Sequence, residues 1–130
     1  MGFRAIEAAP GRNPRELIVS ISKQNGHLPR LRVSLHAEVA AALGWQIGMR
    51  LEPLLGDGPD HGLVKIRPAL TGFKLCRAAG HGNRVWVTFR APAGSPDWQR
   101  NRPADYTTDG PCLTLMLPWA VDMPKLRAIA

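Results

Sequence analysis

The chain has 130 residues, of which 45% are hydrophobic, and its formal net charge is +7 at pH 7. This length fits one domain, or two very small domains that share a core, and the apolar content excludes wholesale disorder. No apolar run approaches the roughly 18 residues that a membrane-spanning helix needs. The first residues lack the pattern of a secretory signal, and two cysteines are too few for a disulfide framework. We therefore expect a cytoplasmic protein without a membrane partner.

The positive charge is concentrated in the middle of the chain. Residues 63–102 contain eight Lys or Arg residues against a single acid, Asp97, whereas the segments on either side are nearly balanced. A concentrated basic field is typical of proteins that bind nucleic acid or another polyanion. The alternative is a solvated basic surface that has no ligand.

The first half of the chain predicts strands around one short helix. In residues 30–36 the apolar side chains of Leu31, Val33 and Leu35 alternate with polar ones, which is typical of a half-buried strand. Residues 37–43 are strong helix formers, and Gly44 supplies the stop. The expected elements are a strand at 17–22, a turn at 24–27, a strand at 30–36, a helix at 37–43, an extended run at 50–55, a turn at 56–62 and a strand at 63–67.

The second half predicts further strands and one long loop. We expect strands at 73–77, 85–90 and 112–117, and a loop at 91–111, where Pro, Gly, Asp and Arg occur without periodicity. Pro118 is suited to the first position of a helix, which Pro124 limits. The order of elements in 17–43 is repeated in 85–127, which leaves a divergent second unit open. The expected fold is mainly β (α+β), with a flexible arm at 1–16, a first unit at 17–68 and a β-rich extension at 69–130 packed on it.

One stretch carries a recognisable pattern. A strand at Arg32–His36 leads into a short helix that closes with Leu43-Gly44, a turn follows at Gly48, and a hairpin ends at Val64–Pro68. Residues 31–68 thereby resemble the AbrB/MazE-type swapped-hairpin DNA-binding domain. The resemblance implies a ββαββ unit that exchanges hairpins with a second copy, because one unit buries too little apolar area alone. It implies a homodimer, or a higher assembly, that binds duplex DNA as a transcriptional regulator or an antitoxin-like factor.

The sequence departs from that pattern at the helix. His36 stands where the family has proline, and Ala40 and Ala41 stand where DNA-binding members carry arginines. Arg32 matches the basic residue at the start of the family's second strand. Cations for DNA therefore have to come from Lys23, Arg30, Arg32 and Arg50, or from the basic second half of the chain.

Two strand faces are candidates for binding DNA. Arg30, Arg32, Ser34 and His36 form the polar face of the strand at 30–36, where arginine can reach phosphates or guanine edges and Ser34 can add a phosphate contact. The second face has Arg84, Trp86, Thr88 and Arg90, which combine phosphate-binding cations with a ring for base stacking. For both faces an ordinary solvated strand is the competing interpretation, with Trp86 packed against the 91–111 loop.

Catalytic and metal-binding patterns are weak. Cys76 and His81 are half of a possible metal site without a second half, and Cys112 begins an apolar strand and is expected to be buried. Carboxylates are scarce after residue 62, so we expect no enzyme, no metal and no cofactor. Two further hypotheses remain: a protein-interaction or assembly module with an unknown protein partner, docking through the helix and the 91–111 loop, and a single-stranded nucleic acid binder centred on Trp86.

Overall fold

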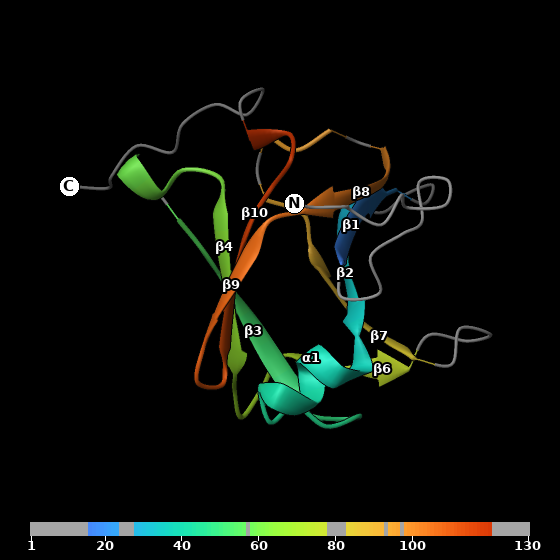
Figure 1. The fold of residues 1–130 in the computed structure, drawn as a ribbon. Coiled ribbons are helices and arrows are strands. Elements are labelled where there is room, and N and C mark those ends of the chain that lie inside the picture. The colour runs from blue at the N-terminus through green and yellow to red at the C-terminus, as the bar shows by residue number, and fades with distance from the viewer. Residues whose placement is uncertain are drawn as a thin grey trace, which may run out of the picture.

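The computed structural model describes residues 16–23, 28–56, 58–77, 83–92, 94–96 and 98–120. The expected turn at 24–27, the end of the chain after residue 120, His81 and all of the expected N-terminal arm except Glu16 lie outside this part. Within it the chain forms ten strands, one α-helix and one short 3₁₀ helix (Figure 1). Their bounds are β1 Leu17–Ser22, β2 Arg30–His36, α1 Ala37–Ala42, β3 Arg50–Leu55, η1 Gly58–Asp60, β4 Leu63–Pro68, β5 Phe73–Lys74, β6 Cys76–Arg77, β7 Arg84–Arg90, β8 Gln99–Ala104, β9 Tyr106–Asp109 and β10 Cys112–Met116.

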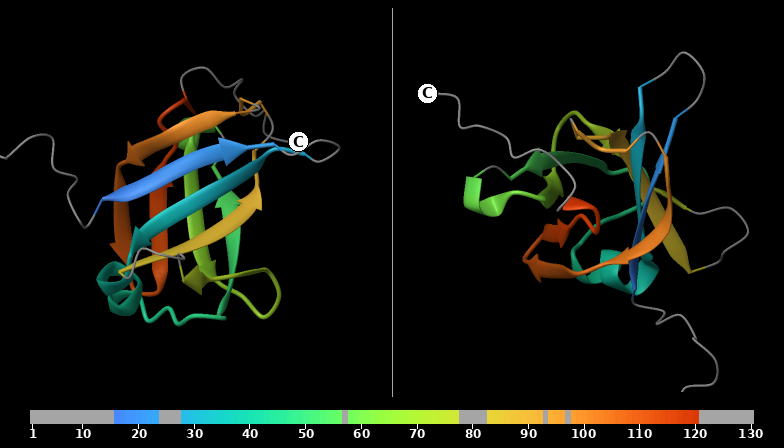
Figure 2. Two further views of the ribbon diagram at one scale, coloured as in Figure 1. Left: turned by 90° about the vertical axis from the view of Figure 1, so that its right-hand side faces the viewer. Right: turned by 90° about the horizontal axis from the view of Figure 1, so that it is seen from above.

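The strands form two five-stranded antiparallel sheets that pack face to face. The first sheet has the order β6-β7-β2-β1-β8, and the second has the order β5-β3-β4-β10-β9. Figure 1 shows both sheets nearly edge-on, with α1 closing one end, and the left view of Figure 2 looks onto the outer face of the first sheet. The mainly β prediction is therefore confirmed.

The two sheets are connected at both edges by strands that bend from one sheet into the other. β5 and β6 are separated only by Leu75, which donates a backbone hydrogen bond to Met49 O (2.9 Å) and accepts one from Gly48 N (2.8 Å). β8 and β9 are separated only by Asp105, whose carbonyl accepts from Met116 N at 2.9 Å. The chain thus passes directly from the edge strand of one sheet into the edge strand of the other at both of these bends.

One hydrophobic core lies between the sheets, and both halves of the chain contribute to it. The alternation predicted for residues 30–36 and 85–90 holds, because Leu31, Val33 and Leu35 of β2 and Val85, Val87 and Phe89 of β7 are all buried. Leu51 and Ile66 from the second sheet, and Leu113 and Leu115 from β10, complete the same cluster. Within the described part of the chain, residues from both 17–68 and 69–120 therefore share one interior.

The strand pairing bears on the expected hairpin exchange. The β1–β2 hairpin is flanked in its sheet by β7 and β8, and the β3–β4 hairpin is flanked by β5 and β10. All of these neighbours come from residues 69–130 of the same chain, so this core does not need strands from a second copy. The repeated order of elements is not matched by the pairing either, because β1 and β2 are neighbours whereas β7 and β10 lie in different sheets.

Two predictions for the second half were wrong. The expected loop at 91–111 contains β8 and β9, and the expected single strand at 73–77 is split at the buried Leu75. β8 lies at the edge of the first sheet, and only Ala104 of its six residues is buried, so burial imposes no apolar alternation on its sequence. An edge strand also tolerates Pro103, which has no N–H to donate.

The short helix begins at a side-chain cap. His36 precedes α1, and its Nδ1 accepts a hydrogen bond from the backbone N–H of Glu38 at 3.0 Å. This bond satisfies one of the free amides in the first turn of the helix, which explains a polar residue at this junction. Gly44 follows the helix with a φ of 79°, the left-handed conformation that glycine adopts without strain. Among the described residues, no helix has the length and apolar character needed to cross a membrane.

Candidate nucleic-acid interface

The pairing of β2 with β7 brings the two candidate faces together. Arg30 lies opposite Arg90, Arg32 opposite Thr88, and Ser34 opposite Trp86. Because the intervening residues point into the core, these side chains all project from the outer face of the first sheet. We call this surface the arginine face. It consists of Arg30, Arg32, Ser34 and His36 of β2 and Arg84, Trp86, Thr88 and Arg90 of β7.

The ring of Trp86 is in contact with Arg32 and is therefore not freely accessible on that side. The guanidinium carbon of Arg32 lies 4.3 Å from the centre of the Trp86 ring, which is a close cation–π contact. Trp86 itself is half-buried and stands opposite Ser34 on one side and Cys76 of β6 on the other. The contact holds the guanidinium over the ring, and the side chain of Arg32 stays exposed at the surface.

Arg84 is held by two hydrogen bonds to Ser34 on the neighbouring strand β2. Its Nε donates to Ser34 Oγ at 3.0 Å, and its Nη2 donates to the backbone carbonyl of Ser34 at 2.8 Å. These two bonds connect β7 to β2 through side chains as well as through the backbone ladder. Ser34 was predicted as a direct phosphate ligand, and here its hydroxyl oxygen accepts a bond from Arg84.

Arg30 and Arg90 are an unfavourable pair in the absence of an anion. They lie directly opposite each other on neighbouring strands, where like charges destabilise a sheet. Both side chains are exposed, and no ion pair with a described residue accompanies either of them. Strands β1, β2 and β7 contain no Asp or Glu at all. The repulsion therefore stays unscreened by acids on these strands, and a bound polyanion would relieve it.

The remaining two predicted residues lie elsewhere. Lys23 directly follows β1, whose last residue Ser22 is paired with Arg30, so Lys23 extends the same end of the first sheet. Arg50 begins β3 in the second sheet, where its Nη1 donates to the carbonyl of Gly72 at 2.8 Å. The buried Leu51 points to the core, so Arg50 points to the opposite outer side and does not belong to the arginine face.

Sequence analysis missed the continuation of this surface across β1 to β8. Trp98 and Arg100 lie there, with the Arg100 guanidinium carbon 5.7 Å from the centre of the Trp98 ring. Both residues belong to the stretch that was assigned to a loop, so no strand face was considered for them. The available signal in the sequence was a tryptophan, Trp98, followed two residues later by Arg100.

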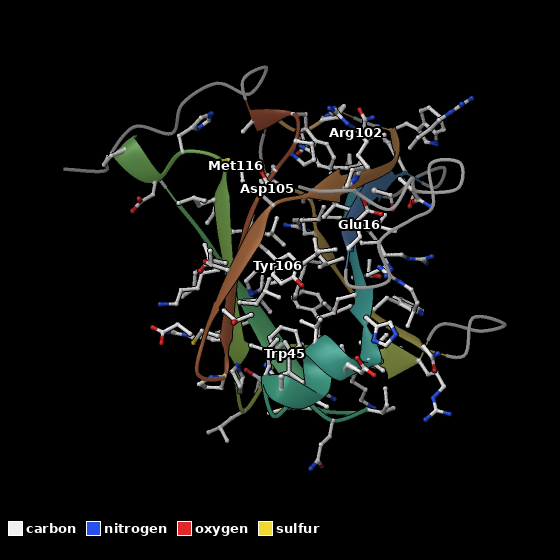
Figure 3. The ribbon with its side chains drawn as sticks, viewed as in Figure 1. Glu16, Trp45, Arg102, Asp105, Tyr106 and Met116 are labelled. Carbon is white, nitrogen blue, oxygen red and sulfur yellow. The ribbon has the colours of Figure 1, made fainter. Side chains whose placement is uncertain are left out.

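A hollow of about 640 Å³ lies at the corner between β8 and β9. Its lining includes Arg102 from the first sheet, Met116 from the second, and Glu16, Asp105 and Tyr106 (Figure 3). Two carboxylates offset the single guanidinium, so this hollow lacks the uniform sign of the arginine face and is less suited to a polyanion.

The cysteines do not form a recognisable site in the described residues. Cys76 Sγ contacts the carbonyl oxygen of Lys74 at 3.6 Å, and Cys112 is half-buried rather than buried as predicted. Among the residues that the structure covers, no group of three or more His, Cys, Asp or Glu side chains is placed to hold a metal ion.

Comparison with known proteins gave no match: no protein-family model, no curated protein and no solved structure resembles the chain to a significant degree.

Proposed function

We propose that this protein binds duplex DNA through the arginine face, as a cytoplasmic regulator that acts by occupying DNA. The observation that carries the proposal is the register that sets Arg30 against Arg90 and places Arg32 and Arg84 on the same side of the sheet. Cross-strand neighbours lie about 5 Å apart, and residues two apart along a strand lie about 7 Å apart. These spacings let several guanidinium groups contact successive phosphates, which supply most of the affinity of such complexes.

The contact between Arg32 and Trp86 favours binding to the sugar–phosphate backbone of DNA, rather than base stacking, on this part of the arginine face. A single-stranded binder centred on Trp86 requires an open ring for a base. In the structure Arg32 already lies over that ring at 4.3 Å, so a base that stacks there has to displace the guanidinium. Trp86 is therefore better suited to orienting Arg32 toward a phosphate.

The similarity of residues 31–68 to the AbrB/MazE-type domain supports DNA as the polyanion. The swapped-hairpin arrangement and the homodimer stay predictions. In the structure, strands of this same chain form both sheets, so neither sheet requires a strand from a second copy. The proposed DNA contact does not depend on them, because all eight residues of the arginine face come from one subunit. The molar mass in solution, with and without duplex DNA, tests the dimer separately.

The test is a salt-dependent titration of a labelled duplex with two charge-matched double variants. Arg30→Ala/Arg90→Ala removes two cations from the arginine face, and Arg50→Ala/Lys65→Ala removes two from the outer side of the second sheet. If four arginines contact phosphates, the slope of log K against log[salt] is about −3.6 for the parent protein and about −1.8 for the first variant. The second variant is expected to keep the slope of the parent protein.

Two outcomes contradict the proposal. Equal losses in both variants would mean that net charge, and not the arginine face, determines binding. No binding to any oligonucleotide at low salt would leave the protein-interaction module, which is the only one of the three hypotheses that predicts this result.

A further inference from the structure

Trp98 and Arg100 extend the outer face of the first sheet beyond the arginine face. Ile21 of β1 points into the core and is paired with Gln99, so the neighbours of Gln99 on either side point outward. Trp98 is 62% exposed, in contrast to the half-buried Trp86 and to Trp45, which is 4% exposed. A large aromatic side chain this exposed gains little from packing within the chain, and its ring is accessible to a ligand.

A bulge in β8 shapes this edge. Val19 is paired with Arg102 and Ile21 with Gln99, so two steps along β1 correspond to three steps along β8. The additional residue places both Arg100 and Asn101 opposite Ser20. Bulges of this kind bend a strand and redirect its side chains, and they are frequent beside binding sites.

A shallow hollow of about 470 Å³ lies on the outer side of β1, between the arginine face and the side chains of Trp98 and Arg100. Its floor includes Ser20 and Ser22, which are paired on their other side with Arg32 and Arg30 of the arginine face. The serine side chains are short, so the surface is low between the arginines and Trp98. Residues 98–101 form the far side of the hollow, and Ile21 lies with the two serines on the β1 side.

We propose that this hollow is a subsite for one unpaired nucleobase, which stacks on Trp98 next to Arg100. The inference rests on the proposed DNA binding, because the arginine face holds the sugar–phosphate backbone from which the base reaches the hollow. A tryptophan face stacks on any base. The Arg100 guanidinium lies over one face of the Trp98 ring, 5.7 Å from its centre, so the base stacks on the opposite face, with this cation nearby. The hydroxyls of Ser20 and Ser22 and the amide of Asn101 supply donors and acceptors for the edge of a base. The preferred ligand is therefore a duplex with a single-stranded extension.

The experiment compares a blunt duplex with the same duplex carrying a short single-stranded tail, at one fixed salt concentration. The parent protein is expected to bind the tailed DNA more tightly. Trp98→Ala is expected to weaken binding of the tailed DNA by about 5- to 150-fold, which corresponds to one stacked base, and to leave blunt binding unchanged within about twofold. Trp98→Phe keeps an aromatic face and is expected to retain part of the preference.

Leu70→Ala provides the matched control, because Leu70 is 99% exposed in the turn that follows β4 and lies outside both surfaces. It is expected to leave both affinities unchanged. The subsite alone is refuted if blunt DNA binds and Trp98→Ala does not alter the preference for the tail, or lowers both affinities equally. If the parent protein binds neither DNA, the proposed function fails and the subsite fails with it.

Discussion

The buried position of Leu75, where the chain passes from the second sheet into the first, allows a quantitative prediction about stability. Leu75 is 1% exposed and sits at the bend between β5 and β6, with backbone hydrogen bonds to Met49 and from Gly48. Leu75→Ala deletes three carbon groups, each worth about 0.8 kcal/mol in transfer free energy. The cavity that remains adds to this loss, so the free energy of unfolding falls by about 2.5–5 kcal/mol.

The expected change in melting temperature follows from the size of the chain. An unfolding entropy of about 2.1 cal/mol/K per residue gives about 0.27 kcal/mol/K for 130 residues. The loss therefore corresponds to a decrease in Tm of about 9–18 °C. Thermal unfolding followed by circular dichroism and by tryptophan fluorescence measures it, and both probes are expected to show one shared transition.

Leu70→Ala is the control for the same chemical change. Leu70 lies five residues earlier and is 99% exposed, so its replacement is expected to change the free energy of unfolding by less than about 0.5 kcal/mol. Similar Tm values for the two variants would refute the burial of Leu75 in the core that the two sheets share. Two separate transitions in the parent protein would also refute it, since residues 69–130 would then unfold as a unit of their own.

Three further predictions concern local structure. His36→Ala removes the helix cap and is expected to cost about 1 kcal/mol in urea unfolding, whereas His36→Asn keeps most of it; equal losses would contradict the cap. A double-mutant cycle of Arg32→Ala and Trp86→Leu is expected to give a coupling of about 0.5–1 kcal/mol in the same assay, and zero coupling would argue against the stacked pair. Gly62→Ala is expected to lower Tm more than Gly44→Ala, because both glycines have positive φ but only at Gly62 does a new Cβ collide with Ala120; the reverse order would contradict this packing.

The elements with one buried face were predictable from the sequence, and the exposed ones were not. β2 and β7 alternate cleanly because one side of each faces the core, and their bounds were found to within one residue. β8 is an edge strand whose residues are mostly exposed, so burial imposes no pattern on it, and Pro103 argued against a strand. The bend at Leu75 depends on contacts with Met49, which is distant in the sequence.

The candidate site was predicted in parts but not as a whole. The sequence identified the polar faces of β2 and β7 separately, since each is local to its strand. That the two faces form one surface depends on the register that sets Arg30 opposite Arg90. This register is fixed by packing between strands that lie about fifty residues apart in the sequence. Arg50 was included because it is basic, and only the assignment of β3 to the second sheet separates it from the others. Trp98 was missed because it directly precedes β8, whose mostly exposed residues show no apolar pattern that predicts a strand.

The most direct measurement is an amide chemical-shift map of the protein by NMR during titration with a short duplex at low salt. The account predicts that the perturbed amides cluster on β1, β2 and β7, around Arg30, Arg32 and Arg90, and that β3, β4 and β9 of the second sheet stay unchanged. Perturbations centred on the second sheet or on α1, with the arginine face unaffected, would contradict it.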